Sequence, residues 1–195
     1  MSFNDLGPEL LNEFESFDDH EYVRRFTIEG DEDDIVAFVA VHNTNLGPSL
    51  GGCRMRPYAT EAEAINDVLR LSRGMTYKNA LAGLPLGGGK AVIIGDHRKD
   101  KTAELMQAIG AAVESFEGAY ITAEDSGSGE EDMVQIASET EHVTGLPPEM
   151  LEGSEYGELG GNPSPLTALG CYHGIKAAIT FRYEGKRDLS DITVS

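Results

Sequence analysis

The chain has 195 residues, of which 40% are hydrophobic and 25% charged, the composition of an ordinary globular protein. Its 34 acidic residues against 15 lysines and arginines give a net charge of −19, which argues against nucleic acid as a partner because phosphate binding needs a basic patch. No run approaches the roughly 20 apolar residues of a membrane span and the acidic N-terminus lacks a secretory leader, so we expect a cytoplasmic protein with no membrane partner.

The part of the chain before residue 57 predicts one short helix and a β-hairpin. Residues 8–17 carry apolar side chains at the spacing of a short amphipathic helix. Tyr22–Ile28 and Ile35–His42 are predicted strands, and the polar residues between them predict a tight turn in which Gly30 takes positive φ. Residues 43–56 are rich in glycine and are expected to be irregular.

After residue 57, helices alternate with short strands. Thr60 and Glu63 form a capping-box pair, which marks the start of a helix that keeps its apolar spacing to about Met75. The elements expected next are a central strand at Ala91–Ile94, a helix with an apolar stripe from Leu105 to Phe116, a strand at Ala119–Ala123, a helix at Glu130–Glu139, a short strand at Val143–Thr144, a glycine-rich loop at 152–161 and a helix at Ser164–Phe181. This alternation predicts an α/β fold: a layered sheet of mixed strands, with the antiparallel hairpin at one edge, flanked by helices.

Residues 87–90 read GGGK, a lysine that follows three glycines. A phosphate-binding loop would read G-x-x-x-x-G-K-[ST], but Leu84 stands in place of its first glycine and Ala91 in place of its hydroxyl residue. The dinucleotide fingerprint G-x-G-x-x-G fails as well, since Val92 occupies its last position. Lys90 therefore needs another explanation, and the plain alternative is that it caps a strand and points to solvent.

Four short segments together predict a site for a small anionic carbonyl compound. They are SLGGCRM (49–55), GMTYKNAL (74–81), GGGK (87–90) and TAEDSG (122–127). Lys78 can hold a carboxylate, although a lysine near the end of a helix is more often a contact with the helix dipole. Lys90, desolvated and near a second cation, is expected to have the lowered pKa that proton transfer near neutrality needs. Asp125, at the carboxyl end of a strand, is the expected partner acid or base, although an aspartate there is more often a turn residue.

The walls of this site are expected to be small or apolar. Glycines 51, 52 and 87–89 would let the backbone approach a small ligand closely. Leu50 and Met75 would supply apolar walls, which lower the local dielectric constant and so strengthen the electrostatic interactions of each charge.

Three stretches carry a resemblance to a known family: residues 42–96, TAED at 122–125 and GGNPSPLTALG at 160–170. They resemble the glutamate/leucine/phenylalanine/valine dehydrogenases, which are oxidative deaminases that use a nicotinamide cofactor. The resemblance covers most of the chain from about residue 10. It implies a first domain that binds substrate and makes oligomer contacts, and a second, Rossmann-type domain that binds the cofactor.

The resemblance also implies roles for individual residues. Lys78 matches the lysine that binds the substrate α-carboxylate, Lys90 the catalytic lysine that activates water and stabilises the oxyanion, and Asp125 the aspartate that shuttles a proton at the amino nitrogen. The matching substrate-pocket positions are Gly51, Gly52 and Met75, and those that touch the cofactor are Arg54, Ser126, Pro163, Ser164 and Thr167.

Leu50 discriminates within the family. Glutamate dehydrogenases have a lysine at this position, and it pairs with the side-chain carboxylate of the substrate. A leucine cannot compensate the desolvation of a carboxylate, so the substrate is expected to be an apolar L-amino acid of the Leu, Val, Ile or Phe type. The implied reaction converts it, with NAD⁺ and water, to the 2-oxo acid, ammonia and NADH, and NADP is possible in place of NAD.

The same resemblance implies a division into domains. Residues 1–185 are expected to be the substrate-binding and oligomerisation domain of a homo-oligomer. Residues 186–195 are expected to be a linker and the first strand of an absent Rossmann-type cofactor domain, so that this chain alone is inactive. The alternative is a non-catalytic oligomerisation or amino-acid-binding module. No metal site is expected, and Cys53 and Cys171 are expected to be reduced, buried thiols.

Overall fold

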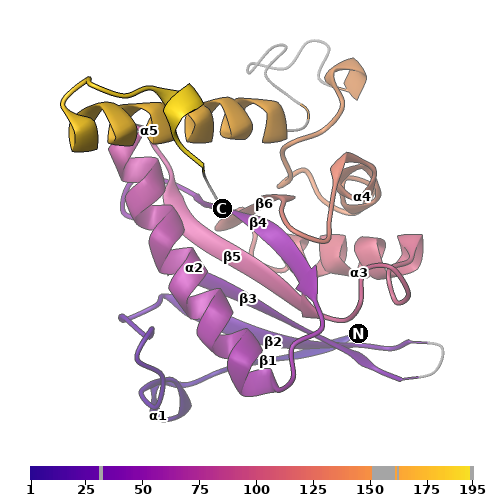
Figure 1. Cartoon of the computed structure of the whole chain (residues 1–195). Coiled ribbons are helices and arrows are strands. Elements are labelled where there is room, and N and C mark those ends of the chain that lie inside the picture. The colour runs from indigo at the N-terminus through magenta and orange to yellow at the C-terminus, as the bar shows by residue number, and fades with distance from the viewer. Residues whose placement is uncertain (31–32, 151–160, 162, 194–195) are drawn as a thin grey trace. The chain divides into compact units, whose positions relative to one another are not determined.

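The structure is a computed structural model that describes residues 1–30, 33–150, 161 and 163–193 (Figure 1). The chain divides into two compact units, Met1–Gly161 and Asn162–Ser195. The functional boundary expected at residue 185 stays a prediction. Most of the expected glycine-rich loop at 152–161 lies outside the described residues.

The first unit is built on a six-stranded sheet with the order β1-β2-β3-β5-β4-β6. The strands are β1 (Ser2–Asp5), β2 (Tyr22–Ile28), β3 (Ile35–Asn43), β4 (Ser49–Arg56), β5 (Gly87–Ile94) and β6 (Tyr120–Glu124). The pairs β1–β2, β2–β3 and β3–β5 are antiparallel. Strand β4 pairs in parallel with both β5 and β6. The expected α/β class with mixed strands is confirmed, and β1, which the sequence did not predict, extends the expected hairpin by one strand.

Helices cover both faces of this sheet. The α-helices of the unit are α1 (Pro8–Leu11), α2 (Glu61–Leu81), α3 (Ala103–Glu114) and α4 (Glu130–Ile136). Alternate residues of a strand point to opposite faces, so Phe38, Ala40 and Val92 pack with α1 and α2. Val39 and Ile93 pack with α3 and α4 on the other face. Figure 1 shows α2 lying across one face of the sheet.

Two elements differ from prediction for the same reason. Residues 49–56 form a regular strand, not an irregular segment, and β5 begins at Gly87, so the three glycines lie within the strand. Glycine is disfavoured in strands by local propensity, but tertiary packing overrides that preference where a side chain would not fit. The start of α2 is as predicted, since the Thr60 side chain accepts the Glu63 N–H at 3.2 Å, but the helix continues beyond Met75 to Leu81.

Several shorter predictions are only partly right. The helix expected over 8–17 ends at Leu11, and the strand expected at 143–144 is a single bridge between Thr122 and Val143. Gly30 does not have positive φ, while residues 31–32 of its turn lie outside the described residues.

The second unit contains α5 (Ser164–Tyr183), close to its predicted bounds. Glu184 follows the last residue of the helix as its C-cap and takes the left-handed conformation with a φ of 52°. A short 3₁₀ turn lies at Leu189–Asp191, within the segment expected to be a linker and a first strand, and the Asp188 carboxylate caps it by accepting the Ser190 N–H at 2.8 Å. Residues 194–195 of that segment lie outside the described residues. Cys53 is buried but Cys171, on α5, is exposed, so the expectation of two buried thiols is wrong for Cys171.

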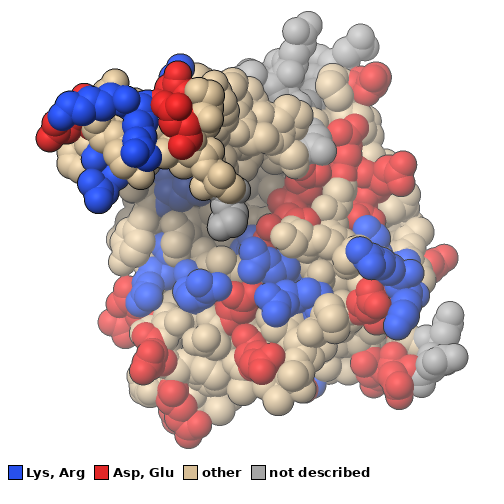
Figure 2. All heavy atoms as spheres, in the orientation of Figure 1, with Lys and Arg blue, Asp and Glu red and all other residues tan. Residues whose placement is uncertain are grey.

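The surface carries charged side chains of both signs. Figure 2 shows acidic side chains spread over the visible face with basic ones among them. Among the residues that the structure describes, no helix is long and apolar enough to cross a membrane.

The segment before β2 is fixed to α2 through a pair of histidines. The Nε2 atom of His20 is 3.1 Å from the Leu69 carbonyl oxygen and 3.0 Å from the Ser72 hydroxyl. Its ring stacks on Phe17 and meets the His42 ring edge-on, with 4.8 Å between the centroids. Burial lowers the pKa of His20 from 6.5 to about 4, because a charged ring would lose its hydration there.

As the pH decreases from about 6.5 to about 4, we expect the free energy of unfolding to fall because of His20. In this range the unfolded chain binds a proton at His20 and the folded chain does not, which favours unfolding by up to about 3 kcal/mol in total. Urea unfolding of the wild type and of His20→Gln, measured from pH 8 to pH 4, checks this. The stability of the wild type relative to the variant should decrease as the pH falls, and a constant difference would contradict the assignment.

Candidate active site

Strand register places the expected site on the face of the sheet that α2 covers. Leu50, Gly52 and Arg54 of β4 point to this face, opposite to the buried Cys53 and Met55. The parallel pairing sets Leu50 beside Gly88 of β5 and Arg54 beside Val92. Lys90 lies between Gly88 and Val92 on the same face, so residues far apart in the sequence become neighbours here.

Lys90 and Asp125 form the centre of the site. Lys90 is 6% exposed, and its ammonium donates a hydrogen bond to Oδ2 of Asp125. Asp125 directly follows β6, whose residues lie next to those of β4. The alternative that Lys90 points to solvent is therefore wrong, because nearly all of its side chain is enclosed and its charge is paired inside the protein.

Burial lowers the pKa of Lys90, the neighbouring Asp125 opposes this shift, and the positive charge of Arg54 adds to it. Burial also raises the pKa of Asp125, but Lys90, the Ser126 backbone and Arg54 together hold it below its ordinary value. The second cation near Lys90 is thus Arg54, which supplies the charge that the sequence predicted without naming its source. Burial raises the pKa of Cys53 to about 12, so this neighbouring thiol stays protonated.

Arg54 links the pair to helix α2. Its Nε donates to Oδ2 of Asp125 at 3.1 Å, and its Nη1 donates to Oδ2 of Asp67 at 2.9 Å. The same Asp67 oxygen accepts the Tyr58 hydroxyl at 2.8 Å, and its other oxygen accepts from Arg70 at 2.8 Å. The sequence analysis missed Asp67 and Tyr58. The signal that could have found Asp67 is a carboxylate within the buried stripe of α2, next to Val68.

Ser128, which the sequence analysis did not single out, helps to fix the backbone of Asp125. The Asp125 N–H donates to the Ser128 hydroxyl at 3.0 Å, and that hydroxyl donates to the Cys53 carbonyl oxygen at 2.6 Å. The Met55 N–H donates to the Ser126 carbonyl oxygen at 2.9 Å. These hydrogen bonds attach the loop that follows β6 to β4, so the backbone of Asp125 is fixed in place.

The glycines of the site allow parts of the protein to approach one another. A Cβ on Gly52 would lie 2.6 Å from the Glu124 carbonyl oxygen and 2.8 Å from the Asp125 Cβ. A Cβ on Gly88 would collide with the backbone of α2 at Thr76. Internal packing therefore requires glycine at these two positions, and substrate contact by Gly51 and Gly52 stays a prediction.

The remaining candidates lie on or near the same elements. Lys78 is exposed in the last turn of α2 and forms no ion pair with any residue that the structure describes. Met75 and Leu50 are half-buried, and Ser126 is exposed beside Asp125. Pro163, Ser164 and Thr167 belong to the second unit, at the start of α5, and their part in the site stays a prediction.

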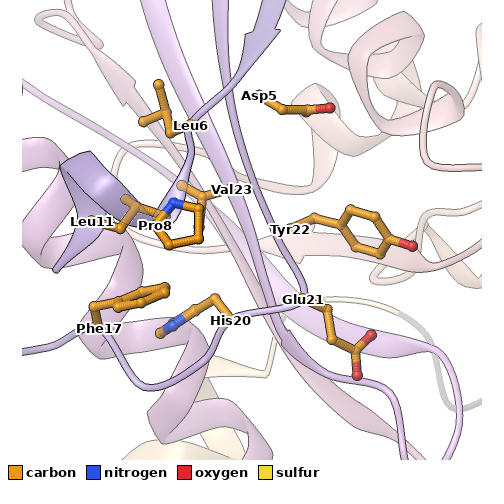
Figure 3. Close-up of a pocket in the computed structure, with 9 residues that line it drawn as sticks. All are labelled: Asp5, Leu6, Pro8, Leu11, Phe17, His20, Glu21, Tyr22 and Val23. Atoms are coloured by element: carbon orange, nitrogen blue, oxygen red, sulfur yellow. The ribbon is translucent and has the colours of Figure 1, made fainter.

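Two other features do not contribute to the site. No group of three or more His, Cys, Asp or Glu within the described ranges could hold a metal ion. A hollow of about 220 Å³ is lined by residues near the N-terminus, among them His20 and Phe17 on one side of the chain and Tyr22 on the other (Figure 3). It shares no residue with the Lys90–Asp125 pair, and Glu21 at its rim already accepts two hydrogen bonds from Thr44.

Comparison with known proteins now decides the family. Residues 20–142 match the profile described as "Glu/Leu/Phe/Val dehydrogenase, dimerisation domain", which covers more than half of the chain. The chain belongs to the Glu/Leu/Phe/Val dehydrogenase family. All the residues of the Lys90, Asp125, Arg54 and Asp67 network lie within the part matched to this dimerisation domain.

Several dehydrogenases are similar to this chain over most of its length. Leucine dehydrogenase of Bacillus subtilis (strain 168) is 50% identical over 165 residues, which are 85% of this chain and 43% of that protein. Phenylalanine dehydrogenase of Caldalkalibacillus thermarum is 52% identical over 145 residues, 74% of this chain and 37% of that protein. The crystal structure of L-tryptophan dehydrogenase from Nostoc punctiforme matches with a TM-score of 0.60 at 40% identity, over 86% of this chain and 44% of that one. The chain thus spans less than half the length of these relatives.

Proposed function

We propose that this chain is the substrate-binding half of an NAD(P)-dependent dehydrogenase that oxidatively deaminates an apolar L-amino acid. The products would be the 2-oxo acid, ammonium, reduced cofactor and a proton. The observation that carries the proposal is the buried pair of Lys90 and Asp125, with Arg54 on the same carboxylate oxygen. An enclosed lysine with a lowered pKa beside an ionised aspartate is suited to proton transfer and to stabilising an oxyanion.

The proposed roles follow from the position of each charge. Lys78, exposed and without an ion pair among the described residues, would bind the substrate α-carboxylate. Lys90 would activate the attacking water and then stabilise the oxyanion that develops at the α-carbon. Asp125 would carry the proton to or from the amino nitrogen, because its backbone and its carboxylate are both held in place.

A nicotinamide cofactor would supply the hydride acceptor. Ser126 is exposed next to Asp125, a position from which its hydroxyl can meet the cofactor at the reacting centre. Arg54, Pro163, Ser164 and Thr167 are the other proposed contacts from this chain, with the main cofactor site in a Rossmann-type domain. The match to a dimerisation domain supports a homo-oligomer as the working assembly.

The nature of Leu50 supports an apolar substrate side chain. Leu50 is half-buried, and its register places it beside Gly88, on the face that carries Lys90. Relatives named for leucine, phenylalanine and tryptophan act on apolar amino acids, in keeping with an apolar residue at this position. A substrate carboxylate next to Leu50 would lose its hydration without gaining a partner.

Turnover by the complete dehydrogenase tests both the function and this assignment. We expect NADH formation from leucine, valine, isoleucine or phenylalanine and little from glutamate. Leu50→Lys should raise kcat/KM for glutamate relative to leucine by about 10–100-fold, because the new ammonium would pair with the side-chain carboxylate. Steady-state kinetics with the two amino acids measure this ratio.

Leu50→Met is the matched control, since it keeps an apolar side chain of similar volume and should keep the preference for leucine. A parallel fall of both kcat/KM values in Leu50→Lys would show that this residue does not contact the substrate. Absence of turnover with every apolar amino acid would count against the function itself, and would favour an amino-acid-binding or oligomerisation module.

A further inference from the structure

The buried carboxylate of Asp67 is used by neither the proposed chemistry nor the hydrophobic core. Its side chain is 10% exposed, on α2 among apolar residues. A carboxylate is buried in this way only when its lost hydration is replaced by hydrogen bonds and opposite charge. Asp67 has three such partners: Arg54 and Tyr58 on one oxygen and Arg70 on the other. These three hydrogen bonds fix the orientation of the Asp67 carboxylate, unlike the loose pairing of a surface ion pair.

Arg54 lies between the carboxylates of Asp67 and Asp125. Its guanidinium donates through Nη1 to Asp67 and through Nε to Asp125, so the two carboxylates hold it from two sides. A free arginine side chain has several torsions and loses rotamer entropy when it is held in one position. Asp67 removes this freedom, and Tyr58, which is itself buried, fixes the Asp67 oxygen that Arg54 binds.

We propose that Asp67 and Tyr58 are positioning residues that hold the Arg54 guanidinium against Asp125, so that this carboxylate stays ionised and oriented toward Lys90. This inference rests on the proposed function for its meaning, but the contacts exist in the chain without it. It assigns to Arg54 a part beyond a cofactor contact: its positive charge acts on both members of the Lys90–Asp125 pair. Asp67 and Tyr58 act only through Arg54 and touch no reacting atom.

Titration of Asp125 and Lys90 in Asp67→Asn tests the proposal through the sign of a pKa change. If Arg54 stays in place, the variant only loses a negative charge, and the pKa of both Asp125 and Lys90 should fall. If Asp67 holds Arg54, the variant releases it, Asp125 and Lys90 lose the nearest additional cation, and both pKa values should rise. The positioning role and the loss of a remote charge therefore predict opposite directions.

The measurement is NMR titration of the Asp125 carboxyl carbon and the Lys90 ε-carbon in this chain. Arg54→Gln gives the full effect of removing the cation, and Asp67→Asn should reproduce most of that rise. Glu61→Gln is the charge-matched control: it removes a carboxylate at the start of the same helix, where the partner is Arg25, and should leave both titrations unchanged. Tyr58→Phe removes only the hydroxyl that fixes Asp67 and should give a smaller rise, which keeps the test available if Asp67→Asn does not fold.

A fall or no change of the Asp125 and Lys90 pKa values in the folded Asp67 and Tyr58 variants would overturn the proposal. The titration needs neither substrate nor cofactor. A dehydrogenase without the expected activity would therefore leave this result standing, and a failed titration would leave the proposed activity open to its own kinetic test.

Discussion

Replacing Lys90 by alanine is expected to lower kcat and kcat/KM together by about 10²–10³-fold in the proposed dehydrogenase. The reason is that its ammonium would interact most strongly with the oxyanion of the transition state, so its loss raises the barrier more than it weakens substrate binding. The burial of Lys90 adds to the effect, since water cannot replace the lost charge efficiently in an enclosed site. Steady-state kinetics with leucine, valine and phenylalanine provide the measurement.

Two other lysines serve as controls for Lys90. Lys78→Ala should act mainly on KM, with a smaller fall in kcat from misorientation, because an exposed anchor contributes to substrate and transition state alike. Lys99→Ala should leave both constants unchanged, since Lys99 is exposed and pairs only with Asp96 among the described residues. Wild-type kcat and an unaltered pH profile in Lys90→Ala would remove Lys90 from the mechanism.

Replacing Gly88 by alanine is expected to destabilise the fold strongly. The added methyl group would collide with the backbone nitrogen and hydroxyl of Thr76 and lie 2.5 Å from the Ser72 carbonyl oxygen, so α2 would have to move away from β5. Overpacking of a core typically costs about 1–3 kcal/mol, and a clash with backbone atoms belongs at or above the upper end. For a chain of this length that corresponds to a Tm lower by roughly 10 °C. Thermal unfolding followed by circular dichroism measures it.

Gly74→Ala is the matched control on the same helix. Gly74 is exposed in α2 and has no atom within 4 Å of the position of an added Cβ. Alanine should therefore stabilise the helix by about 0.5–1 kcal/mol, because it restricts the unfolded chain without a clash. If Gly88→Ala instead kept the stability of the wild type and raised KM, the glycines would be there to admit the substrate and not to admit α2.

The predicted and observed structures differ mainly where backbone packing overrides local preference. The helices α2, α3 and α5 and the strands β2 and β3 have the regular apolar spacing from which a period can be read, and they were predicted within a few residues, except at the C-terminal end of α2. Strand β4 and the first part of β5 contain paired and triple glycines, which local rules assign to loops. These segments nevertheless pair as strands, and glycine is needed within them because a Cβ on Gly51 would lie 1.7 Å from the Gly89 carbonyl oxygen.

The sequence by itself determined the resemblance to the family, the candidate residues Lys90 and Asp125, and the apolar position Leu50, because each can be read from short motifs without knowledge of the fold. Only the tertiary structure decided which cation lies beside Lys90 and what holds Asp125 in place. Arg54 and Asp125 are 71 residues apart in the chain, and their 3.1 Å contact exists only because β4 pairs in parallel with β6. Asp67 reaches Arg54 only because α2 packs across that face of the sheet. Such contacts between distant residues follow from the arrangement of strands and helices, which no local pattern encodes.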